Sequence, residues 1–142
     1  ADTDMGYLLK VVVNGEFICN LTTWDTREAM NTTAAGVARD VDELSLAGLT
    51  AEPGQCVDVP RVAEAPVHLE CRYIKTTELP GDTANDVYCV IFGQVVGINI
   101  KDEFITGDGE VDVGKMQPIA RLGYQDYAVV NSDTIFTMQR PE

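Results

Sequence analysis

Basic residues are scarce in this chain of 142 residues, which carries 10 Lys and Arg against 23 Asp and Glu. With its one histidine neutral, the formal net charge is -13 at pH 7. Nucleic-acid backbones and anionic membrane surfaces carry the same sign of charge, so the average surface of this protein repels them. We therefore expect partners that are neither nucleic acid nor membrane.

Long hydrophobic runs are also absent. The longest, Val87–Phe92 and Val95–Ile100, are strand-sized, whereas a membrane helix needs about 20 apolar residues. The chain opens on Ala1-Asp2-Thr3-Asp4, which is acidic where a secretory signal is basic, and no apolar signal core follows. We therefore expect a cytoplasmic protein without a membrane span. The absence of an initiator Met also suggests processing or a truncated chain.

Patterns typical of metal sites are sparse. The single histidine, His68, lies in the alternating run Val67–Cys71, which is typical of a hydrogen-bonded histidine in a strand. Residues 107–112 superficially resemble a calcium loop but lack the EF-hand ligand spacing, which favours a turn with solvated carboxylates. No C-x-x-C pair exists, so we expect no zinc site and four buried, reduced thiols. The cysteines are Cys19, Cys56, Cys71 and Cys89.

Two large classes of enzyme are disfavoured by missing motifs. A Ser-His-Asp or Cys-His site would have to use His68, and no local nucleophile and base accompany it. There is no Walker A loop, and no G-x-G-x-x-G sequence follows a strand. Hydrolase chemistry and a Rossmann nucleotide site are therefore unsupported, and the sequence identifies no catalytic residue.

The first half of the chain is predicted to hold short helices around one strand. Met5, Leu8, Leu9 and Val12 follow helical spacing, with Asn14-Gly15 as the stop. Further along, strand-forming residues predict a strand. Two helix starts are predicted by the capping-box spacing of Asp25 with Glu28 and of Asp40 with Glu43, and an extended segment follows them. These are a strand at Phe17–Thr22, a helix at Thr26–Thr33, a helix from Asp40 through Leu46 ending at Gly48, and an extended stretch at 50–66.

The second half is predicted to consist of strands separated by turns. The expected strands are Val67–Ile74, Val87–Ile100, Asp102–Thr106, Tyr124–Val130 and Thr134–Met138. Both alternating sets of Val87–Ile100 are apolar, so one face would fill a barrel and the other would meet helices or a partner chain. Gly93 and Gly97 are candidates for bulges at which this strand bends. No linker divides the chain, so we expect residues 1–142 to form one domain.

Several segments, in this order along the chain, resemble the flavin reductase-like family. The resemblance is carried by Gly15-Glu16-Phe17, Trp24–Thr33, Asp42-Glu43-Leu44, Ala47–Thr50, Pro60-Arg61-Val62, Glu64–Val67, Leu69–Arg72, Phe92–Ile98 and Ala120–Gly123 with Tyr127-Ala128. Phe92–Ile98 resembles the family's F-G-E-V-V-G-I strand, and Ala120–Ala128 resembles its R-L-G-G-x-x-Y-A segment. The resemblance implies a mainly β protein with short helices, built as an FMN-binding split barrel.

That resemblance also implies a homodimer with the flavin near the subunit interface, and NAD(P)H as the co-substrate that reduces the flavin or another acceptor. Hydride chemistry of this kind belongs to the cofactor, which agrees with the lack of local catalytic residues. Family members normally begin with further barrel strands and a K-D-T phosphate-binding segment, of which only Ala1-Asp2-Thr3 resembles the end. We therefore expect the chain to be either a fragment or a member that has lost part of its flavin site.

Six residues are candidates to contact the flavin: Thr3, Asn31, Thr32, Arg121, Gly123 and Tyr124. Backbone N–H groups near Thr3 could bind the phosphate, although helix capping is the alternative. Arg121 could place positive charge near the N1–O2 edge of the ring, or could form a surface or interface ion pair. Asn31 and Thr32 could bond the ring edge or only the end of their helix.

One further aromatic residue has two interpretations. Trp24 could stack on the flavin or form a hydrophobic staple with Ala29. For the whole chain, two functions remain open. One is an FMN-dependent oxidoreductase of the flavin reductase type, and the other is a flavin-binding or vestigial split-barrel protein without reductase turnover of its own.

Overall fold

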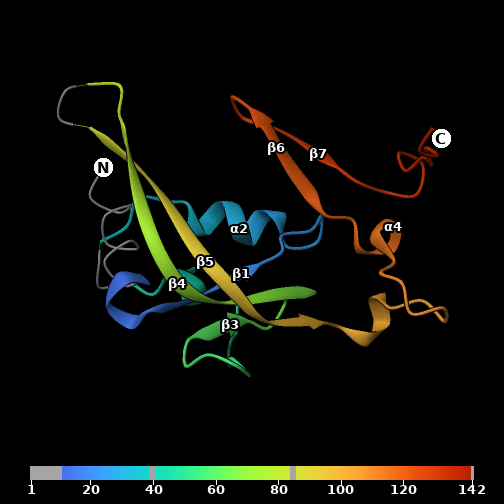
Figure 1. The fold of residues 1–142 in the computed structure, drawn as a ribbon, viewed down its shortest axis with the longest axis horizontal. Coiled ribbons are helices and arrows are strands. Elements are labelled where there is room, and N and C mark those ends of the chain that lie inside the picture. The colour runs from blue at the N-terminus through green and yellow to red at the C-terminus, as the bar shows by residue number, and fades with distance from the viewer. Residues whose placement is uncertain (1–10, 39–40, 84–85, 142) are drawn as a thin grey trace.

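The computed structural model describes residues 11–38, 41–83 and 86–141. Its strands are β1 (Glu16–Asn20), β2 (Ala51–Pro53), β3 (Pro60–Val62), β4 (Val67–Pro80), β5 (Val87–Ile100), β6 (Ile119–Gly123) and β7 (Asp126–Val129). Its helices are α2 (Arg27–Thr33), α3 (Glu43–Leu46), α4 (Val113–Met116) and the 3₁₀ turn η1 (Asp102–Phe104). Figure 1 shows a long, curved β-hairpin formed by β4 and β5, with α2 to its right, and a second hairpin standing apart, nearer the C-terminal end of the chain.

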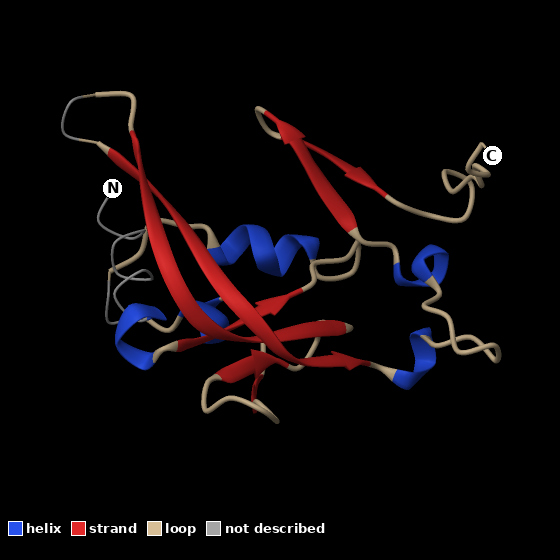
Figure 2. Cartoon of the chain, in the orientation of Figure 1, coloured by secondary structure: helices blue, strands red, loops and turns tan. Residues whose placement is uncertain are grey.

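Three antiparallel sheets organise these strands, as the cartoon in Figure 2 shows. The largest has the order β1-β4-β5, while β2 with β3 and β6 with β7 form two-stranded sheets. Within the described residues the largest sheet does not close on itself, so β5 has a free edge. Among these residues there is also no helix with the length and apolarity to cross a membrane.

The glycines of β5 lie where its pairing with β4 is irregular, as predicted. The register shifts between Glu70 and Cys71, next to the pair of Glu70 with Gly97, and again after the pair of Tyr73 with Gly93. Neither glycine has room for a side chain. A Cβ at Gly93 would overlap the Phe17 ring, and one at Gly97 would lie 2.8 Å from the Cys56 sulfur. These bulges let the long hairpin curve around its neighbours.

The predicted helices are present, but their caps differ from expectation. Thr26, not Asp25, is the N-cap of α2, and its side chain accepts a hydrogen bond from Thr23 N at 3.0 Å instead of capping the helix. In α3 the Asp42 carboxylate accepts from Leu44 N at 3.1 Å, so the cap predicted at Asp40 is displaced, and Asp40 itself lies outside the described residues. Gly48, with φ of +69°, ends this turn as expected.

The helix predicted from Met5 falls mostly outside the described residues. Its last described part, residues 11–14, is helical. Gly15 N donates to Val11 O at 2.9 Å, and the φ of +70° at Gly15 takes the chain out of the helix as predicted.

Other predicted strands were wrong in extent or type. Residues 102–106 begin with η1, because Phe104 N donates back to Lys101 O in a tight turn. Residues 134–138 form no strand and are exposed, since no described strand lies beside them to accept their hydrogen bonds. Sequence patterning also missed β6 and α4, ended β4 six residues early at Ile74, and described the β2–β3 hairpin only as extended.

Burial in this chain is concentrated where β4 meets the β2–β3 hairpin. In the run from Val67 to Cys71 the polar residues His68 and Glu70 are buried, and the Glu70 side chain is fully enclosed. The apolar residues of β5 are instead largely exposed, so the expectation that both its faces are covered is wrong for the single chain. The exposed set comprises Val87, Tyr88, Val90, Phe92, Val95 and Ile98.

Candidate functional site

A groove of about 580 Å³ runs between α2 and the β6–β7 hairpin. We call it the α2–β6 groove. Its volume falls in the range of small-molecule and cofactor sites, which are mostly apolar with a few placed polar groups. The lining fits this description, with aromatic and aliphatic side chains and two arginines. It consists of Trp24, Arg27, Glu28, Met30, Asn31, Ala34, Ile119, Arg121, Tyr124, Gln125, Tyr127, Ala128 and Val129.

The α2–β6 groove brings together three of the six predicted site residues. Asn31 comes from α2, whereas Arg121 and Tyr124 come from the β6–β7 hairpin, about ninety positions later in the chain. Gly123 lies in the same hairpin and Thr32 in the same helix, but neither lines the groove. Thr3 lies outside the described residues.

Arg121 is held by its own hairpin. Its Nη2 donates to Tyr124 O at 3.2 Å, and its guanidinium carbon lies 6.0 Å from the centre of the Tyr127 ring. Arg121 makes no ion pair within the part of the chain that the structure describes. Most of its hydrogen-bond donors are therefore directed to the groove or to solvent, which suits the binding of a negatively charged group.

The turn between β6 and β7 has an unusual backbone. Tyr124 has a φ of +49° and follows Gly123, whose φ is +130°. A tight hairpin turn favours glycine where φ is positive, so a tyrosine there carries strain. Tyr124 is 96% exposed, so packing among the described residues gives no reason for an aromatic residue at this position.

Asn31 and Thr32, near the end of α2, differ in the hydrogen bonds that they make. The Thr32 hydroxyl donates to Glu28 O at 3.0 Å within the helix, which favours the helix-end role over a flavin contact. Asn31 uses its backbone carbonyl to accept from Ala34 N at 3.2 Å, while its side chain lines the groove.

Sequence reasoning missed Arg27, which lies on the same wall of the groove as Trp24. The Arg27 guanidinium carbon lies 3.7 Å from the centre of the Trp24 ring, and Arg27 Nη1 also donates to Trp24 O. One face of the Trp24 ring is therefore covered by a cation. The signal available in the sequence was the spacing of three between an aromatic residue and an arginine at a helix start.

A second cavity, of about 800 Å³, lies between β1 and the segment that carries α2 and α3. It is lined mainly by aliphatic side chains, among them Ile18, Leu21 and Leu44. Among the described residues its polar groups come largely from acids and amides such as Glu16 and Asn20. The arginines that line the α2–β6 groove make that groove the better candidate for an anionic cofactor.

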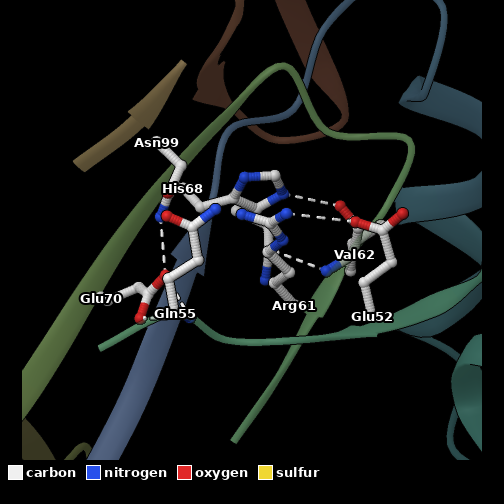
Figure 3. Close-up of polar contacts among 8 residues, drawn as sticks. Glu52, Gln55, Arg61, Val62, His68, Glu70 and Asn99 are labelled. Carbon is white, nitrogen blue, oxygen red and sulfur yellow. Dashed lines mark hydrogen bonds and ion pairs between the residues drawn. The ribbon is translucent and has the colours of Figure 1, made fainter. Parts of the chain in front are cut away.

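Glu70, the most buried ionisable residue among those described, has a structural role. Glu70 accepts hydrogen bonds from Gln55 N at 3.0 Å, Cys56 N at 2.5 Å and Val57 N at 3.1 Å, and from the Asn99 side chain at 2.6 Å. We call this cluster the Glu70 centre, and Figure 3 shows Glu70 facing Gln55 and Asn99. Burial raises the pKa of the Glu70 carboxyl, but these donors outweigh it and the net pKa is lowered.

His68 and Arg61 extend this support toward the β2–β3 hairpin. A ring nitrogen of His68, Nε2, lies 2.7 Å from Val62 O, which confirms the predicted hydrogen-bonded strand histidine. Arg61 pairs with Glu52 at 3.3 Å, and both pairs are visible in Figure 3. Because these polar groups are turned toward one another, the cluster holds β4, β5 and the hairpin together.

All four cysteines are free, as predicted, but only Cys71 is buried. Cys19 on β1, Cys89 on β5 and Cys56 in the loop between β2 and β3 are exposed, so the expectation that all four thiols are buried is wrong. Burial raises the pKa of the Cys71 thiol, and the neighbouring Cys19 thiol raises it further. Within the described ranges no three His, Cys, Asp or Glu side chains gather as metal ligands.

Known proteins resemble this chain over most of its length. It is 28% identical over 127 residues to an uncharacterized protein of Halalkalibacterium halodurans, covering 89% of this chain and 59% of the relative. It is 32% identical over 118 residues to an uncharacterized protein of Deinococcus radiodurans, covering 81% and 49% respectively. The chain therefore spans about half to three fifths of the length of these relatives.

Solved structures show the same fold. Nitrilotriacetate monooxygenase component B from Bacillus cereus superposes with a TM-score of 0.82 at 27% identity, covering 97% of this chain and 65% of that one. Flavoredoxin of Desulfovibrio vulgaris superposes with a TM-score of 0.79 at 19% identity, covering 94% and 67%. Residues 8–120 match the family model described as flavin reductase like domain. The chain thus belongs to the flavin reductase-like family, a family of flavin-related oxidoreductases, and has its mainly β, split-barrel fold.

Proposed function

We propose that this chain binds FMN in the α2–β6 groove and acts as an oxidoreductase of the flavin reductase type. Hydride would pass from NAD(P)H to FMN or onward to a further acceptor. The observation that carries the proposal is the convergence of Asn31, Arg121 and Tyr124 on one groove of about 580 Å³. Family membership over residues 8–120 supports the flavin, and the resemblance supports the nicotinamide donor.

The groove suits a flavin in both shape and chemistry. Its aromatic and aliphatic walls could cover the ring system, while Asn31 and Arg121 offer hydrogen-bond donors to the polar ring edge. Bound FMN would supply the hydride-accepting ring, which the protein itself lacks. Gly123 contributes through the turn that presents Tyr124, and Thr32 through the helix that presents Asn31.

Arg121 is the residue we expect to act electrostatically. Negative charge accumulates at the N1–O2 edge of a flavin on reduction, and a cation held beside that edge stabilises the charge. Its hydrogen bond to Tyr124 O orients the guanidinium before any ligand arrives, which reduces the reorganisation needed when charge develops.

A second copy of the chain is the partner we propose. The exposed apolar side chains of β5, of which Val87 and Ile98 are 56% and 63% exposed, support a covered face in the assembled protein. Sedimentation should give twice the chain mass of 15.5 kDa, and a monomer at micromolar concentration would contradict the dimer. We further propose a cytoplasmic location, which is consistent with four free cysteines.

Absorbance spectroscopy tests the proposal directly. The purified protein, mixed with FMN and freed of excess, should retain bands in the visible that bleach when NAD(P)H is added without oxygen. Retained bands that NAD(P)H leaves unchanged would favour a flavin-binding protein without reductase turnover. A protein that retains no FMN would overturn the proposal.

A further inference from the structure

The α2–β6 groove has an excess of basic residues within a strongly acidic chain. Arg27 lines it from α2 and Arg121 from β6, whereas Glu28 is the acidic residue in its described lining. The chain as a whole has 10 basic residues and 23 acidic ones. Random placement would favour an acidic lining, so the two arginines indicate that negatively charged groups bind in this groove.

Arg27 is ordered by its neighbours in the chain. Its guanidinium carbon lies 3.7 Å from the centre of the Trp24 ring, and its Nη1 donates to Trp24 O. Its Nε lies 3.5 Å from the Glu28 carboxylate, whose side chain is 82% exposed, so this ion pair is a weak surface contact. Nη2 of Arg27 makes no hydrogen bond to the described residues. The Arg27 side chain is 36% exposed, so a ligand can reach its guanidinium.

The two ligands of the proposed reaction bring different negative charges to this groove. The charge that develops at the N1–O2 edge of the flavin faces Arg121. The family resemblance assigns the flavin phosphate to the segment that ends at Thr3, which lies outside the described residues. Hydride transfer requires the nicotinamide ring to approach the flavin ring to within about 3.5 Å, so the hydride donor enters the same groove together with its own phosphates. Arg27 is the groove cation that remains for those phosphates.

We propose that Arg27, stacked on Trp24, binds a phosphate group of the nicotinamide dinucleotide that reduces the flavin. This inference rests on the proposed function, because it places the hydride donor beside the flavin in the same groove. Arginine presents paired donors in one plane that match phosphate oxygens, and a guanidinium already ordered by stacking loses little freedom on binding. The pyrophosphate is common to NADH and NADPH, whereas the 2′-phosphate belongs to NADPH alone.

Binding without turnover is the first test, measured by calorimetry with oxidised dinucleotides on FMN-loaded protein. The wild type should bind NAD⁺ at least roughly tenfold more tightly than nicotinamide riboside, which has the same ring without phosphate. Arg27→Gln should weaken NAD⁺ binding by roughly 10- to 100-fold, the usual effect of losing a hydrogen bond to a charged group. The dissociation constants of FMN and of nicotinamide riboside should change less than about twofold. Arg27→Lys, which keeps the charge but loses the planar fork, should fall between the wild type and Arg27→Gln.

NADP⁺ identifies which phosphate is bound. Equal losses for NAD⁺ and NADP⁺ in Arg27→Gln would assign the contact to the pyrophosphate. A larger loss for NADP⁺ would assign it to the 2′-phosphate. Both results support a phosphate contact at Arg27.

Kinetics give a second measurement. With NADH as the donor, Arg27→Gln should raise KM and leave kcat within about twofold, because a contact to a group that does not react stabilises the bound substrate and the transition state equally. The uncharged donor N-benzyl-1,4-dihydronicotinamide has no phosphate, so it should reduce bound FMN equally fast in the wild type and in Arg27→Gln.

Arg140→Gln is the matched control. It removes the same charge from an exposed position outside both described cavities, so it should leave all of these constants unchanged. Circular dichroism should show that Arg27→Gln and Arg27→Lys remain folded.

The possible outcomes keep this inference apart from the proposed function. The role of Arg27 would be overturned, and the reductase function left standing, if the wild type binds NAD⁺ no more tightly than nicotinamide riboside. Unchanged NAD⁺ affinity in Arg27→Gln, or equal losses for NAD⁺ and FMN, would have the same consequence. An equal loss of NAD⁺ affinity in Arg140→Gln would show a general effect of net charge and would also overturn it. If neither NADH nor the uncharged donor reduces bound FMN in the wild type, the proposed reductase function falls and this inference falls with it.

Discussion

The Glu70 centre and the α2–β6 groove use polar groups in opposite ways. At the Glu70 centre a fully buried carboxylate receives four donors, and the chain around it has no room to change, since a Cβ at Gly54 would lie 2.5 Å from Val57 O. In the groove two arginines keep donors free, and Tyr124 is exposed with a positive φ. Satisfied polar groups fix a fold, whereas unsatisfied ones and local strain mark a site where a ligand can contribute.

The largest effect that we expect from this comparison is the loss of stability in Glu70→Gln. The new amide would direct N–H groups at backbone donors of residues 55–57 and leave some of them unpaired. We expect a loss of about 2–4 kcal/mol in the free energy of unfolding, measured by urea titration. Leu122→Gln, on an exposed side chain, is the control and should change it by less than about 0.5 kcal/mol. A loss below about 1 kcal/mol in Glu70→Gln would contradict the structural role.

Acid should weaken the same centre. The folded pKa of Glu70 lies below its ordinary value of 4.5 because of its hydrogen-bond donors. A lowered folded pKa means that the ionised carboxylate adds stability above the unfolded pKa, and that this stability is lost as pH falls through the folded pKa. The urea midpoint of the wild type should therefore drop between pH 5 and 3. The drop should be smaller in Glu70→Gln. Equal drops in the two proteins would contradict the stabilising role of the ionised Glu70 carboxylate.

On the groove side, the largest expected effect is kinetic. Arg121→Ala should slow anaerobic reduction of bound FMN by NAD(P)H about tenfold or more, because a cation held near the developing charge is lost. Stopped-flow absorbance measures this rate. The melting temperature should change little, since Arg121 is exposed, and an unchanged rate would remove Arg121 from the proposed mechanism.

The smallest effect is expected at Tyr124, where two variants distinguish backbone strain from a contact between the ring and the flavin. Tyr124→Gly should raise the free energy of unfolding by about 1 kcal/mol or less, because glycine accepts a positive φ without a steric cost. Tyr124→Ala removes the ring but keeps the unfavourable backbone, so it should give no such gain. If both variants weaken FMN binding equally, the ring contacts the flavin. If neither variant weakens FMN binding, Tyr124 does not contact the flavin.

The sequence predicted elements whose signals are local. The bounds of β5 at Val87–Ile100 and the end of α3 at Gly48 follow from an apolar run between turn residues and from a glycine stop. Residues 134–138 have strand propensity but no partner strand, and β6 exists because β7 folds back on it. Pairing of this kind is decided by tertiary structure, which propensity alone does not contain.

The candidate site could also be predicted only in part, because tertiary structure decides which of its residues come together. Asn31, Arg121 and Tyr124 were found through family resemblance, and the fold then brought them to one groove. Glu70 was missed, because an acidic residue in an alternating strand is typical of the solvent-exposed face, whereas Glu70 is fully buried here. A loop of backbone N–H groups at residues 55–57 reverses that preference, and no pattern within β4 reveals it.

The long β4–β5 hairpin also sets the order in which the chain should fold. Its two strands are neighbours in the sequence, so they can zip together from their shared turn with little loop-closure entropy. In contrast, β1 must find β4 across the whole segment that contains α2, α3 and the β2–β3 hairpin. We expect β1 to dock late, and the wall of the groove that α2 provides to become ordered only after that step.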